Sequence, residues 1–463
     1  MVLVVTSMLG CTVPNPRSCA DGRCTDPSFP FCDVDGALSG TPQTCLDVAC
    51  TPDEHVSCRG DVAIRCNPTG NDYDLIDCTD GCSDQGCVIP VACTTNDQCV
   101  NPVPICEPTM MSCRGCRTDD ECTSKVCDLD SGACLAEAAV IYASATGSGT
   151  ADCTQLAPCT IARAVSFAAV GGLSKTLRLL PGIYGESLTV TGTVAMKIVA
   201  TGASIVANNS KLVVNGGATV EIRGLTVDPS GNARALECGL ANSVRTTLTM
   251  RDMKLDGRSN LSQQSVFSTQ CTIRVERFEN IGKFSASDGT ILEMDRLLQR
   301  TGFVQGQLSM TGAPAISIRI TNSLFLDGYL SQSSSEAKLA FNTFIFTSSN
   351  NAAGCDTSTT ALMTTYENNI FFAFPSTQLP FAVVPGSCRF ANNLMFPQAT
   401  PVPGNMVADP QFVDPAMDYH LKTTSPALNT AVPSTGLSTS HDYDGAARPQ
   451  GVAHDIGAFE RTP

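Results

Sequence analysis

The amino-acid sequence predicts an all-β chain whose larger part is a solenoid of short stacked strands, preceded by a loop-rich, disulfide-rich region. A short phrase with apolar residues at alternate positions returns about once every 24 residues between positions 223 and 396. Alternation with a period of two identifies a strand, and a fixed long repeat indicates one unit stacked on copies of itself. In addition, 19 of the 25 cysteines lie in the first 134 residues, a density typical of small disulfide-bonded modules.

The repeated phrase reads Asn-x-apolar-x-apolar in its clearest form. Clear copies begin at Asn322, Asn342, Asn368 and Asn392, and weaker copies begin at Arg223, Arg251, Glu276 and Asp295. Strands this short suit a coil that turns a corner every few residues. The unit resembles one rung of the right-handed parallel β-helix of the pectate-lyase-like family, in which turn asparagines and apolar side chains stack between rungs. A β-sandwich with irregular spacing is the alternative.

Both ends of the predicted β-helix (residues 139–398) have recognisable sequences. Residues 160–170 have apolar positions at helical spacing and resemble the helix that caps many β-helix proteins, because an open coil end exposes unpaired backbone groups. Residues 399–463 are predicted to form a C-terminal cap that folds back. Motifs such as Asp409-Pro-Gln-Phe-Val-Asp414 and Asp455-Ile-Gly-Ala-Phe-Glu460 resemble the choice-of-anchor Q signature of bacterial surface β-helix proteins. That resemblance implies location and fold, not a settled activity.

Residues 12–138 are predicted to form an acidic stalk of three cysteine modules, spanning 19–45, 50–87 and 93–134. Residues 12–135 carry 7 Lys and Arg against 20 Asp and Glu, so most of the net charge of −15 lies there. No basic stripe of the kind that binds nucleic acid is present, so no nucleic-acid partner is expected. Cys113-Arg-Gly-Cys116 has zinc-like or redox-like spacing, but two disulfide halves fit this setting better.

Residues 1–11 are interpreted as a signal peptide that ends in a lipobox. Met8-Leu9-Gly10-Cys11 resembles the bacterial lipobox, which implies that Cys11 carries lipid and anchors the chain in a membrane. Thr12 in place of Asp implies the outer membrane, with the protein at the cell surface. The apolar run is short and lacks a preceding Lys or Arg, which a start codon assigned too far downstream would explain.

Setting Cys11 aside leaves an even number of cysteines, including three pairs in the solenoid. Cys153 and Cys159 are expected to close a loop. Cys238 and Cys271 are 33 residues apart, as are Cys355 and Cys388. Both pairs have similar placement relative to the repeat, so we expect staples between adjacent rungs, each contributing about 2–4 kcal/mol.

Charged residues occupy the positions of the repeat that are expected to face outward or lie at corners. If apolar residues two and four places after each phrase opening face inward, the outward or corner set is Asp252, Lys254, Arg277, Glu279 and Arg296. β-Helix polysaccharide lyases use such a face, where acidic groups hold Ca²⁺ and an arginine or lysine removes a proton. An exposed salt-bridge ladder explains the alternating signs as well. Asp252, Arg277 and Arg296 are therefore weak catalytic candidates, and a non-enzyme is favoured.

The same outward position becomes apolar farther along the chain, at Leu298, Phe325, Ile345, Phe371 and Met395. An exposed apolar row needs a cover, and we expect the C-terminal segment to supply it. A sugar-stacking strip or a partner-docking strip is the alternative.

The C-terminal segment also contains candidate metal ligands. Zinc could be bound by His420, His441 and His454, whereas Ca²⁺ would use the hard oxygen ligands of Asp442, Asp444, Asp455 and Glu460. Capping bonds and turn chemistry are the alternative for these residues. Apart from possible Ca²⁺, no cofactor is expected.

Three functions remain open after the sequence is read. The first is a surface lipoprotein whose β-helix binds polysaccharide or extracellular matrix without turnover. The second is a polysaccharide lyase or glycoside hydrolase, and the third is a purely structural envelope protein. The glycan, the partner and the oligomeric state are not encoded in any motif we recognise.

Overall fold

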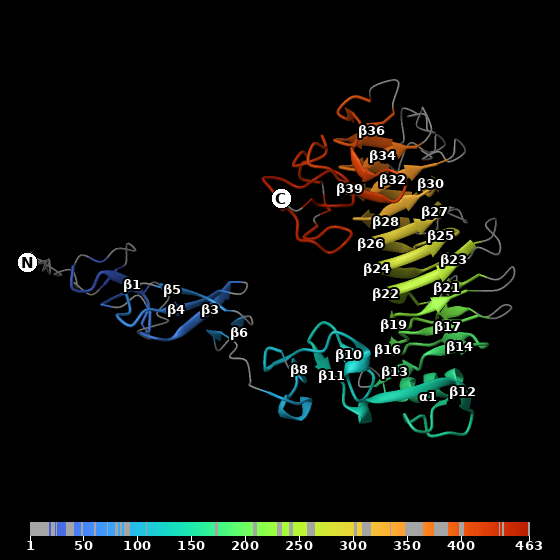
Figure 1. Ribbon diagram of the computed structural model, residues 1–463, viewed down its shortest axis with the longest axis horizontal. Coiled ribbons are helices and arrows are strands. Elements are labelled where there is room, and N and C mark those ends of the chain that lie inside the picture. Colours follow the sequence, from blue (N-terminus) through green and yellow to red (C-terminus); the bar gives the residue numbers. More distant parts are fainter. Residues whose placement is uncertain are drawn as a thin grey trace, which may run out of the picture. The chain divides into compact units, whose positions relative to one another are not determined.

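The computed structural model describes residues 18–461 with several gaps, so residues 1–17, including Cys11, lie outside it. The longer omitted segments are 20–23, 34–40, 88–92, 207–210, 229–233, 240–243, 257–263, 308–315, 348–363, 375–387 and 398–401. The chain divides into two compact units (Figure 1). Unit 1 comprises Met1–Cys116 with Ser131–Ala133, and unit 2 comprises Arg117–Asp130 with Cys134–Pro463. The sequence placed this boundary near residue 138, so part of the third cysteine module belongs with the β-helix.

Unit 1 is built from short antiparallel strands and disulfides. The bonds are Cys19–Cys32, Cys24–Cys45, Cys50–Cys66, Cys93–Cys106 and Cys99–Cys113. Cys116 is also disulfide-bonded, so the Cys113/Cys116 pair offers no thiolate to a metal. The elements are β1 (Phe31–Asp33), β2 (Thr44–Leu46), β3 (His55–Arg59), β4 (Val62–Cys66), β5 (Tyr73–Asp77), β6 (Cys82–Ser83), β7 (Gly86–Cys87), η1 (Asn96–Gln98), β8 (Ile105–Glu107) and β9 (Ser112–Arg114).

Unit 2 is a parallel β-helix, which confirms the predicted fold class. A 19-stranded parallel sheet runs the length of the coil (Figure 1). Its strands are β12 (Val140–Ser148), β13 (Thr176–Leu179), β14 (Gly182–Tyr184), β16 (Ala195–Val199), β17 (Ala203–Ile205), β19 (Thr219–Arg223), β20 (Thr226–Val227), β22 (Thr246–Asp256), β24 (Cys271–Ile281), β26 (Ile291–Arg300), β28 (Ile316–Thr321), β29 (Leu324–Leu326), β31 (Ser335–Ala340), β32 (Thr343–Phe346), β33 (Thr364–Glu367), β34 (Ile370–Ala373), β35 (Cys388–Ala391), β36 (Leu394–Phe396) and β37 (Met406–Val407).

A second parallel sheet of seven strands completes the rungs as far as β30. It contains β15 (Leu188–Val190), β18 (Leu212–Val214), β21 (Leu236–Cys238), β23 (Gln264–Ser268), β25 (Lys283–Ser287), β27 (Phe303–Gln307) and β30 (Tyr329–Ser333). The Cys238–Cys271 disulfide joins β21 to β24, which is the staple between successive rungs that the spacing predicted. Cys153 is bonded to Cys159. Cys388 is disulfide-bonded as well, whereas Cys355 lies outside the described residues.

The cap helix lies where the sequence placed it. Helix α1 (Ile161–Gly171) buries Ile161, Ala164 and Ala168 in the same apolar core that fills the coil. The Oε1 atom of Glu186 accepts a hydrogen bond from the Ile161 backbone N–H at 3.0 Å, so a carboxylate satisfies one unpaired group at the start of the helix. The helix therefore closes the first rungs. Among the residues that the structure describes, no helix is both long and apolar enough to cross a membrane.

Buried asparagines form a ladder along the later rungs. Asn342, Asn369, Asn393 and Asn405 follow one another, and each Oδ1 from Asn369 onward accepts from the preceding member's backbone N–H at 2.9 Å. The amide nitrogens donate to backbone carbonyls inside the coil. The ladder thus satisfies backbone groups that a tight corner leaves unpaired.

The conformation of the corner residues shows that the predicted register is wrong on several later rungs. The corner residue has a positive φ on every rung, at Asp252, Arg277, Arg296, Asn322, Phe341, Asn368 and Asn392. The phrase begins one residue before the corner at Arg251 but at the corner itself at Asn322. Such a slip by one residue moves side chains to the opposite face. Phe325, Phe371 and Met395 are therefore interior core residues, not part of an outer row.

On the rungs of Phe325, Phe371 and Met395 the outer apolar row is formed by neighbouring positions, and the C-terminal segment covers the row. Leu324, Ile345, Ile370, Phe372 and Leu394 form one buried cluster with Phe412, Tyr419, Ile456 and Phe459, and Leu298 packs against its edge. The segment includes the antiparallel pair β38 (Phe412–Asp414) and β39 (Asp418–Leu421). Figure 1 shows this segment beside the rungs from β28 to β36. The expected cover is therefore present: it lies over Leu298 and Ile345 as predicted, whereas Phe325, Phe371 and Met395 lie inside the coil.

Candidate ligand-binding groove

A groove crosses the outward face of the 19-stranded sheet between two covering segments. One cover is residues 117–130 beside β13 to β19, and the other is the C-terminal segment beside the later rungs (Figure 1). Between them, β22, β24, β26 and β28 expose their outward side chains. Strands in a sheet are about 4.8 Å apart, so this window is about 14 Å wide.

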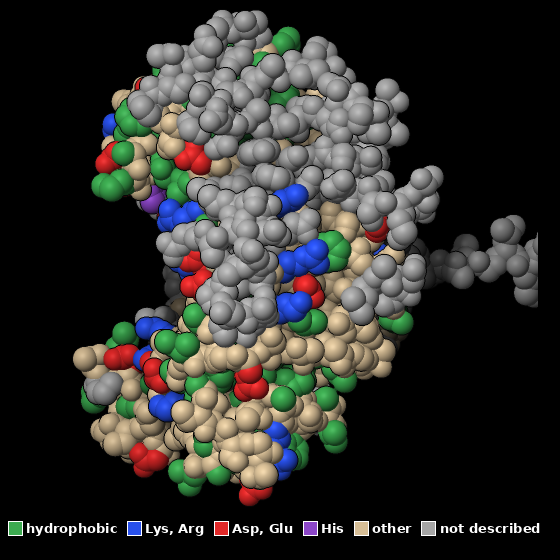
Figure 2. Space-filling view, turned by 90° about the vertical axis from the view of Figure 1, so that its right-hand side faces the viewer, with side chains coloured by type: hydrophobic (Ala, Val, Ile, Leu, Met, Phe, Trp, Pro, Cys, Tyr) green, Lys and Arg blue, Asp and Glu red, His purple; other side chains and the backbone are tan. Residues whose placement is uncertain are grey.

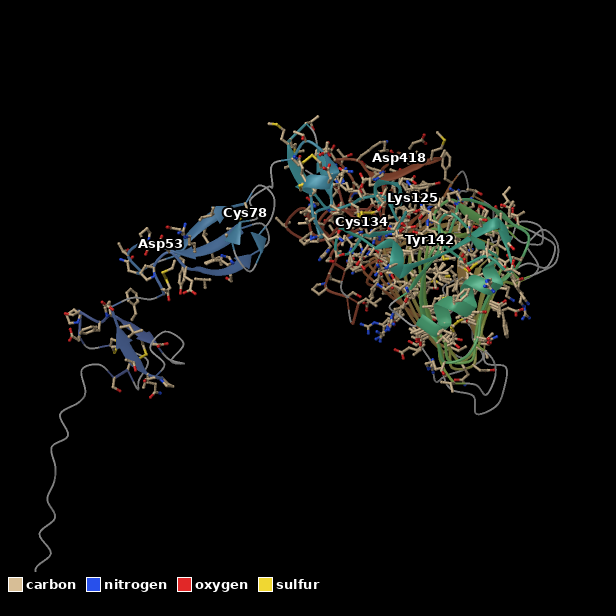
Figure 3. All side chains as sticks on the ribbon, turned by 90° about the horizontal axis from the view of Figure 1, so that it is seen from below. Asp53, Cys78, Lys125, Cys134, Tyr142 and Asp418 are labelled. Carbon is tan, nitrogen blue, oxygen red and sulfur yellow. A yellow bond between two sulfur atoms is a disulfide. The ribbon has the colours of Figure 1, made fainter. Side chains whose placement is uncertain are left out.

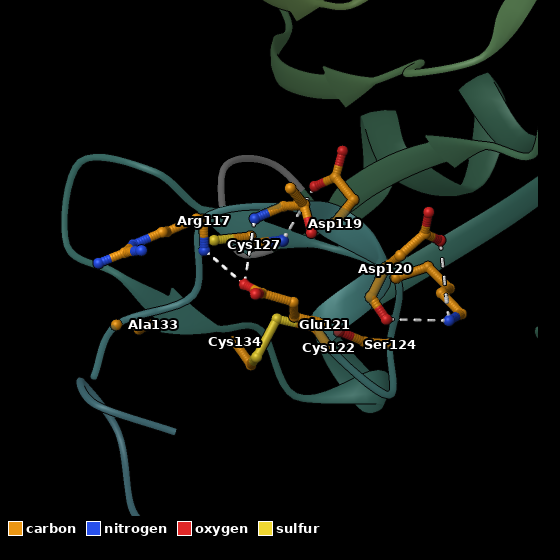
Figure 4. The surroundings of a disulfide bond; sticks show 12 residues. Arg117, Asp119, Asp120, Glu121, Cys122, Ser124, Cys127, Ala133 and Cys134 are labelled. Carbon is orange, nitrogen blue, oxygen red and sulfur yellow. Dashed lines mark hydrogen bonds and ion pairs between the residues drawn. A yellow bond between two sulfur atoms is a disulfide. The ribbon is translucent and has the colours of Figure 1, made fainter. Parts of the chain in front are cut away.

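The first cover contains η2 (Asp119–Glu121) and β10 (Cys127–Asp128), and β11 (Ala133–Cys134) and η3 (Glu137–Ala139) follow it in the chain. The Cys122–Cys134 disulfide holds its fold (Figure 4). Tyr142, labelled in Figure 3, donates from Oη to the carbonyl of Ser124 at 3.0 Å.

A buried ion pair docks this cover on the coil. Arg223 Nη2 lies 2.5 Å from Asp119 Oδ1, and both side chains are nearly buried. Asp119 also accepts from the Thr201 hydroxyl at 2.7 Å. Such a fully partnered buried carboxylate fixes the position of the cover, because losing any partner would leave a charge without compensation.

Two cavities lie along the groove and share Arg251 and Glu276. The first, of about 320 Å³, lies against the first cover, with Asp128, Asp130, Arg223 and Arg277 among its lining residues. The second, of about 490 Å³, lies against the C-terminal segment and is lined by residues that include Arg274, Glu293, Arg319, Ser440 and His441. The two cavities therefore adjoin at Arg251 and Glu276, and each is bounded by one of the two covers.

Glu276 is the centre of the charged network on the groove floor. Its carboxylate contacts Arg277 Nη1 at 2.6 Å, Arg251 Nε at 3.3 Å, and Arg296. Arg251 also reaches Asp130 of the first cover at 3.1 Å. The predicted candidates Asp252, Arg277 and Arg296 therefore belong to one network, and Asp252 joins it through Arg277 at 2.5 Å.

The electrostatic setting of Arg277 is opposite to what a catalytic base requires. Its hydrogen bonds to Asp252, together with the charges of Asp252 and Glu276, raise the pKa of Arg277 above its ordinary value. A lyase base needs a lowered pKa. At Arg251 burial opposes the charged form, but Asp130, Glu221 and Glu276 outweigh it and raise the pKa of Arg251. Arg251 and Arg277 are thus positively charged hydrogen-bond donors on the floor of the groove.

The predicted calcium ligands serve as hydrogen-bond acceptors within the C-terminal segment. Glu460 pairs with Arg448 at 2.8 Å, and both side chains are fully buried. Asp442 accepts from the Ala446 and Glu460 backbone N–H groups, and Asp455 accepts from those of Asn429 and Arg461. This is the capping and turn chemistry that was the alternative reading. Asp444 contacts His420 instead.

The three candidate zinc histidines have different surroundings. His420 Nδ1 lies 2.5 Å from Asp418 and Nε2 lies 2.6 Å from Asp444. Burial opposes its charged form, but the hydrogen bonds to both carboxylates raise the pKa of His420. His441 contacts Asp295 at 2.7 Å, and the ring of His454 lies beside Phe341. The structure therefore does not bring these histidines to one metal site.

Several residues of the groove were missed by the sequence reading. Arg274, Glu293 and Arg319 lie two or three residues before a phrase opening, are paired on adjacent strands, and line the second cavity. Each of them follows a buried residue, Ile273, Leu292 or Ile318, and this alternation indicates that their side chains face outward. Asp130 could not be found from the sequence, because only tertiary packing brings it to Arg251. On a different face, shown in Figure 2, acidic and basic side chains are scattered among polar and apolar ones.

No protein-family model and no curated protein matches the chain. The crystal structure of pectate lyase Pel9A is similar, with a TM-score of 0.36 and 12% sequence identity. The match covers 70% of this chain and 96% of that chain. A similarity of this size carries no argument about activity.

Proposed function

We propose that this chain is a lipid-anchored protein of the bacterial outer membrane whose β-helix binds a polysaccharide without cleaving its backbone. The observation that carries the proposal is the charged network around Glu276, which is exposed in a groove bounded by two covers. Paired guanidinium and carboxylate groups donate and accept hydrogen bonds in fixed directions, as recognition of a hydroxyl-rich polymer requires. Fold alone does not decide function, so the proposal depends on this site.

The raised pKa of Arg277 supports binding over lyase chemistry. A protonated, doubly paired guanidinium cannot take a proton from a sugar carbon at neutral pH. Cleavage by a lyase or a glycoside hydrolase remains the competing function, and a purely structural envelope protein is the third. These three functions predict different results when the chain is tested on a glycan panel.

Binding is tested on a glycan panel with the full chain. The double variant Arg274→Ala/Arg319→Ala should weaken binding of the captured polymer at least about tenfold, equivalent to about 1.4 kcal/mol, because both side chains line the open cavity. Lys422→Ala, outside both groove cavities, is the matched control and should bind normally. Ultraviolet-absorbing unsaturated ends in the digest would support the lyase function instead. Failure to bind any polymer would leave the structural role.

Lipidation gives a separate prediction. Cys11→Ser should move the protein from the detergent fraction to the aqueous fraction or block its processing, because the thioether that carries the lipid is lost. Intact mass spectrometry of the membrane fraction should find a diacylated or triacylated N-terminal cysteine in the parent protein only. A mature chain that retains Met1 and carries no lipid would contradict the anchor.

A further inference from the structure

An Asp–His–Ser chain of side chains lies at the edge of the second cavity, and the proposed binding function does not use it. Asp295 Oδ2 lies 2.7 Å from His441 Nε2, and His441 Nδ1 lies 3.4 Å from Ser440 Oγ. With a hydrogen on Nε2, the ring donates to Asp295 and presents the Nδ1 lone pair to the serine hydroxyl. This is the order of roles that activates a nucleophilic serine.

The acid and the histidine are held in place by their neighbours. Asp295 Oδ1 accepts from the Thr321 hydroxyl and from Asn322 Nδ2, each at 2.9 Å. The Thr439 hydroxyl donates to the carbonyl of His441 at 2.5 Å, and His441 forms a β-bridge with Ala447. Neighbours that fix an acid and a base are what preorganise a catalytic chain. The contact to Ser440 is long at 3.4 Å, and catalytic hydrogen bonds often tighten only when the substrate binds.

The serine is accessible, and a cation lies on the same cavity. Ser440 is exposed and Arg319 is exposed on β28. Both line the cavity of about 490 Å³. Among the described residues the Arg319 side chain has no hydrogen-bond or ion-pair partner, unlike that of Arg274, which pairs with Glu293 at 2.8 Å. An unpaired guanidinium at this position suits the negative charge that develops when an ester carbonyl is attacked.

We propose that Ser440, His441 and Asp295 hydrolyse small acyl esters, such as acetyl groups carried by sugar hydroxyls. Ser440 Oγ bonds to the acyl carbon while His441 Nδ1 takes the hydroxyl proton. The C–O bond to the alcohol then breaks, and the alcohol leaves with that proton. Water attacks the acyl-serine with His441 as base, which releases the carboxylic acid and restores Ser440. The polymer backbone stays intact, so this activity goes beyond the proposed binding.

The test uses the full chain with p-nitrophenyl acetate and a fluorophosphonate probe, neither of which requires polymer binding. The probe should label Ser440, as mapped by peptide mass spectrometry, and Ser440→Ala should abolish both labelling and turnover. His441→Gln should lower kcat/KM about 100-fold. Ser434→Ala is the matched control, because Ser434 lies on the same segment but donates to Glu367 at 2.6 Å.

Two results would overturn the proposal. One is a labelled residue other than Ser440, and the other is a Ser440→Ala variant that hydrolyses the ester at the parent rate. Ser440 is exposed, so its replacement should leave the far-ultraviolet circular dichroism spectrum unchanged. If the glycan panel fails while Ser440 is labelled, the binding proposal falls and the esterase proposal stands.

Discussion

Replacing Asn369 by Ala is expected to lower the free energy of unfolding of the β-helix by about 3 kcal/mol. Asn369 is fully buried, and its Nδ2 donates to the carbonyls of Leu339 and Glu367 and to Asn393 Oδ1, each at 3.0 Å. Its Oδ1 accepts from the backbone and side chain of Asn342. Alanine leaves the buried backbone N–H of Asn342 without its acceptor and removes one hydrogen bond from each of the other groups, which costs more than the lost bonds themselves.

Urea unfolding followed by circular dichroism and tyrosine fluorescence measures this change, since the chain has no tryptophan. Asn405→Ala is the control, because Asn405 ends the ladder and is only partly buried. Because the Asn405 side chain is partly exposed, water can enter the space that it leaves, and its loss should cost less than about 1.5 kcal/mol. Equal effects at the two positions would mean that the ladder does not act as a buried network.

Replacing Glu460 by Ala is expected to destabilise the C-terminal cover by about 3–5 kcal/mol. Glu460 and Arg448 are fully buried, and Glu460 also accepts from the backbone N–H groups of Gln450 and Asp455. The variant leaves the Arg448 guanidinium buried without its counter-charge. We expect early proteolysis of the C-terminal segment and a lower midpoint of thermal unfolding.

Glu336→Ala is the matched control, because its pair with Lys338 is exposed and 3.7 Å long. Such pairs contribute about 0–1 kcal/mol. A Glu460→Ala protein as resistant to protease as this control would contradict the assigned role. Ca²⁺ should not change the result, since the carboxylates concerned already accept backbone hydrogen bonds.

The repeat in the sequence was enough to predict the parallel β-helix and its cap helix, because both depend on local periodicity and spacing. It also identified the pair Cys238 and Cys271, which the coil brings together between adjacent rungs. The predicted register was wrong at Phe325, Phe371 and Met395. The repeats were aligned by residue type, whereas the rungs are in register by the residue that has a positive φ at each corner. Asn at positive φ was the overlooked signal, because asparagine tolerates the left-handed region better than most residues.

The groove itself depends on contacts between distant parts of the chain. Asp119 meets Arg223 and Asp295 meets His441 across 104 and 146 residues. No pattern in the sequence predicts these contacts, because they depend on how two irregular segments pack on the folded β-helix. Short-range periodicity therefore fixes the coil, whereas packing at long range decides which charged residues stay open to a ligand.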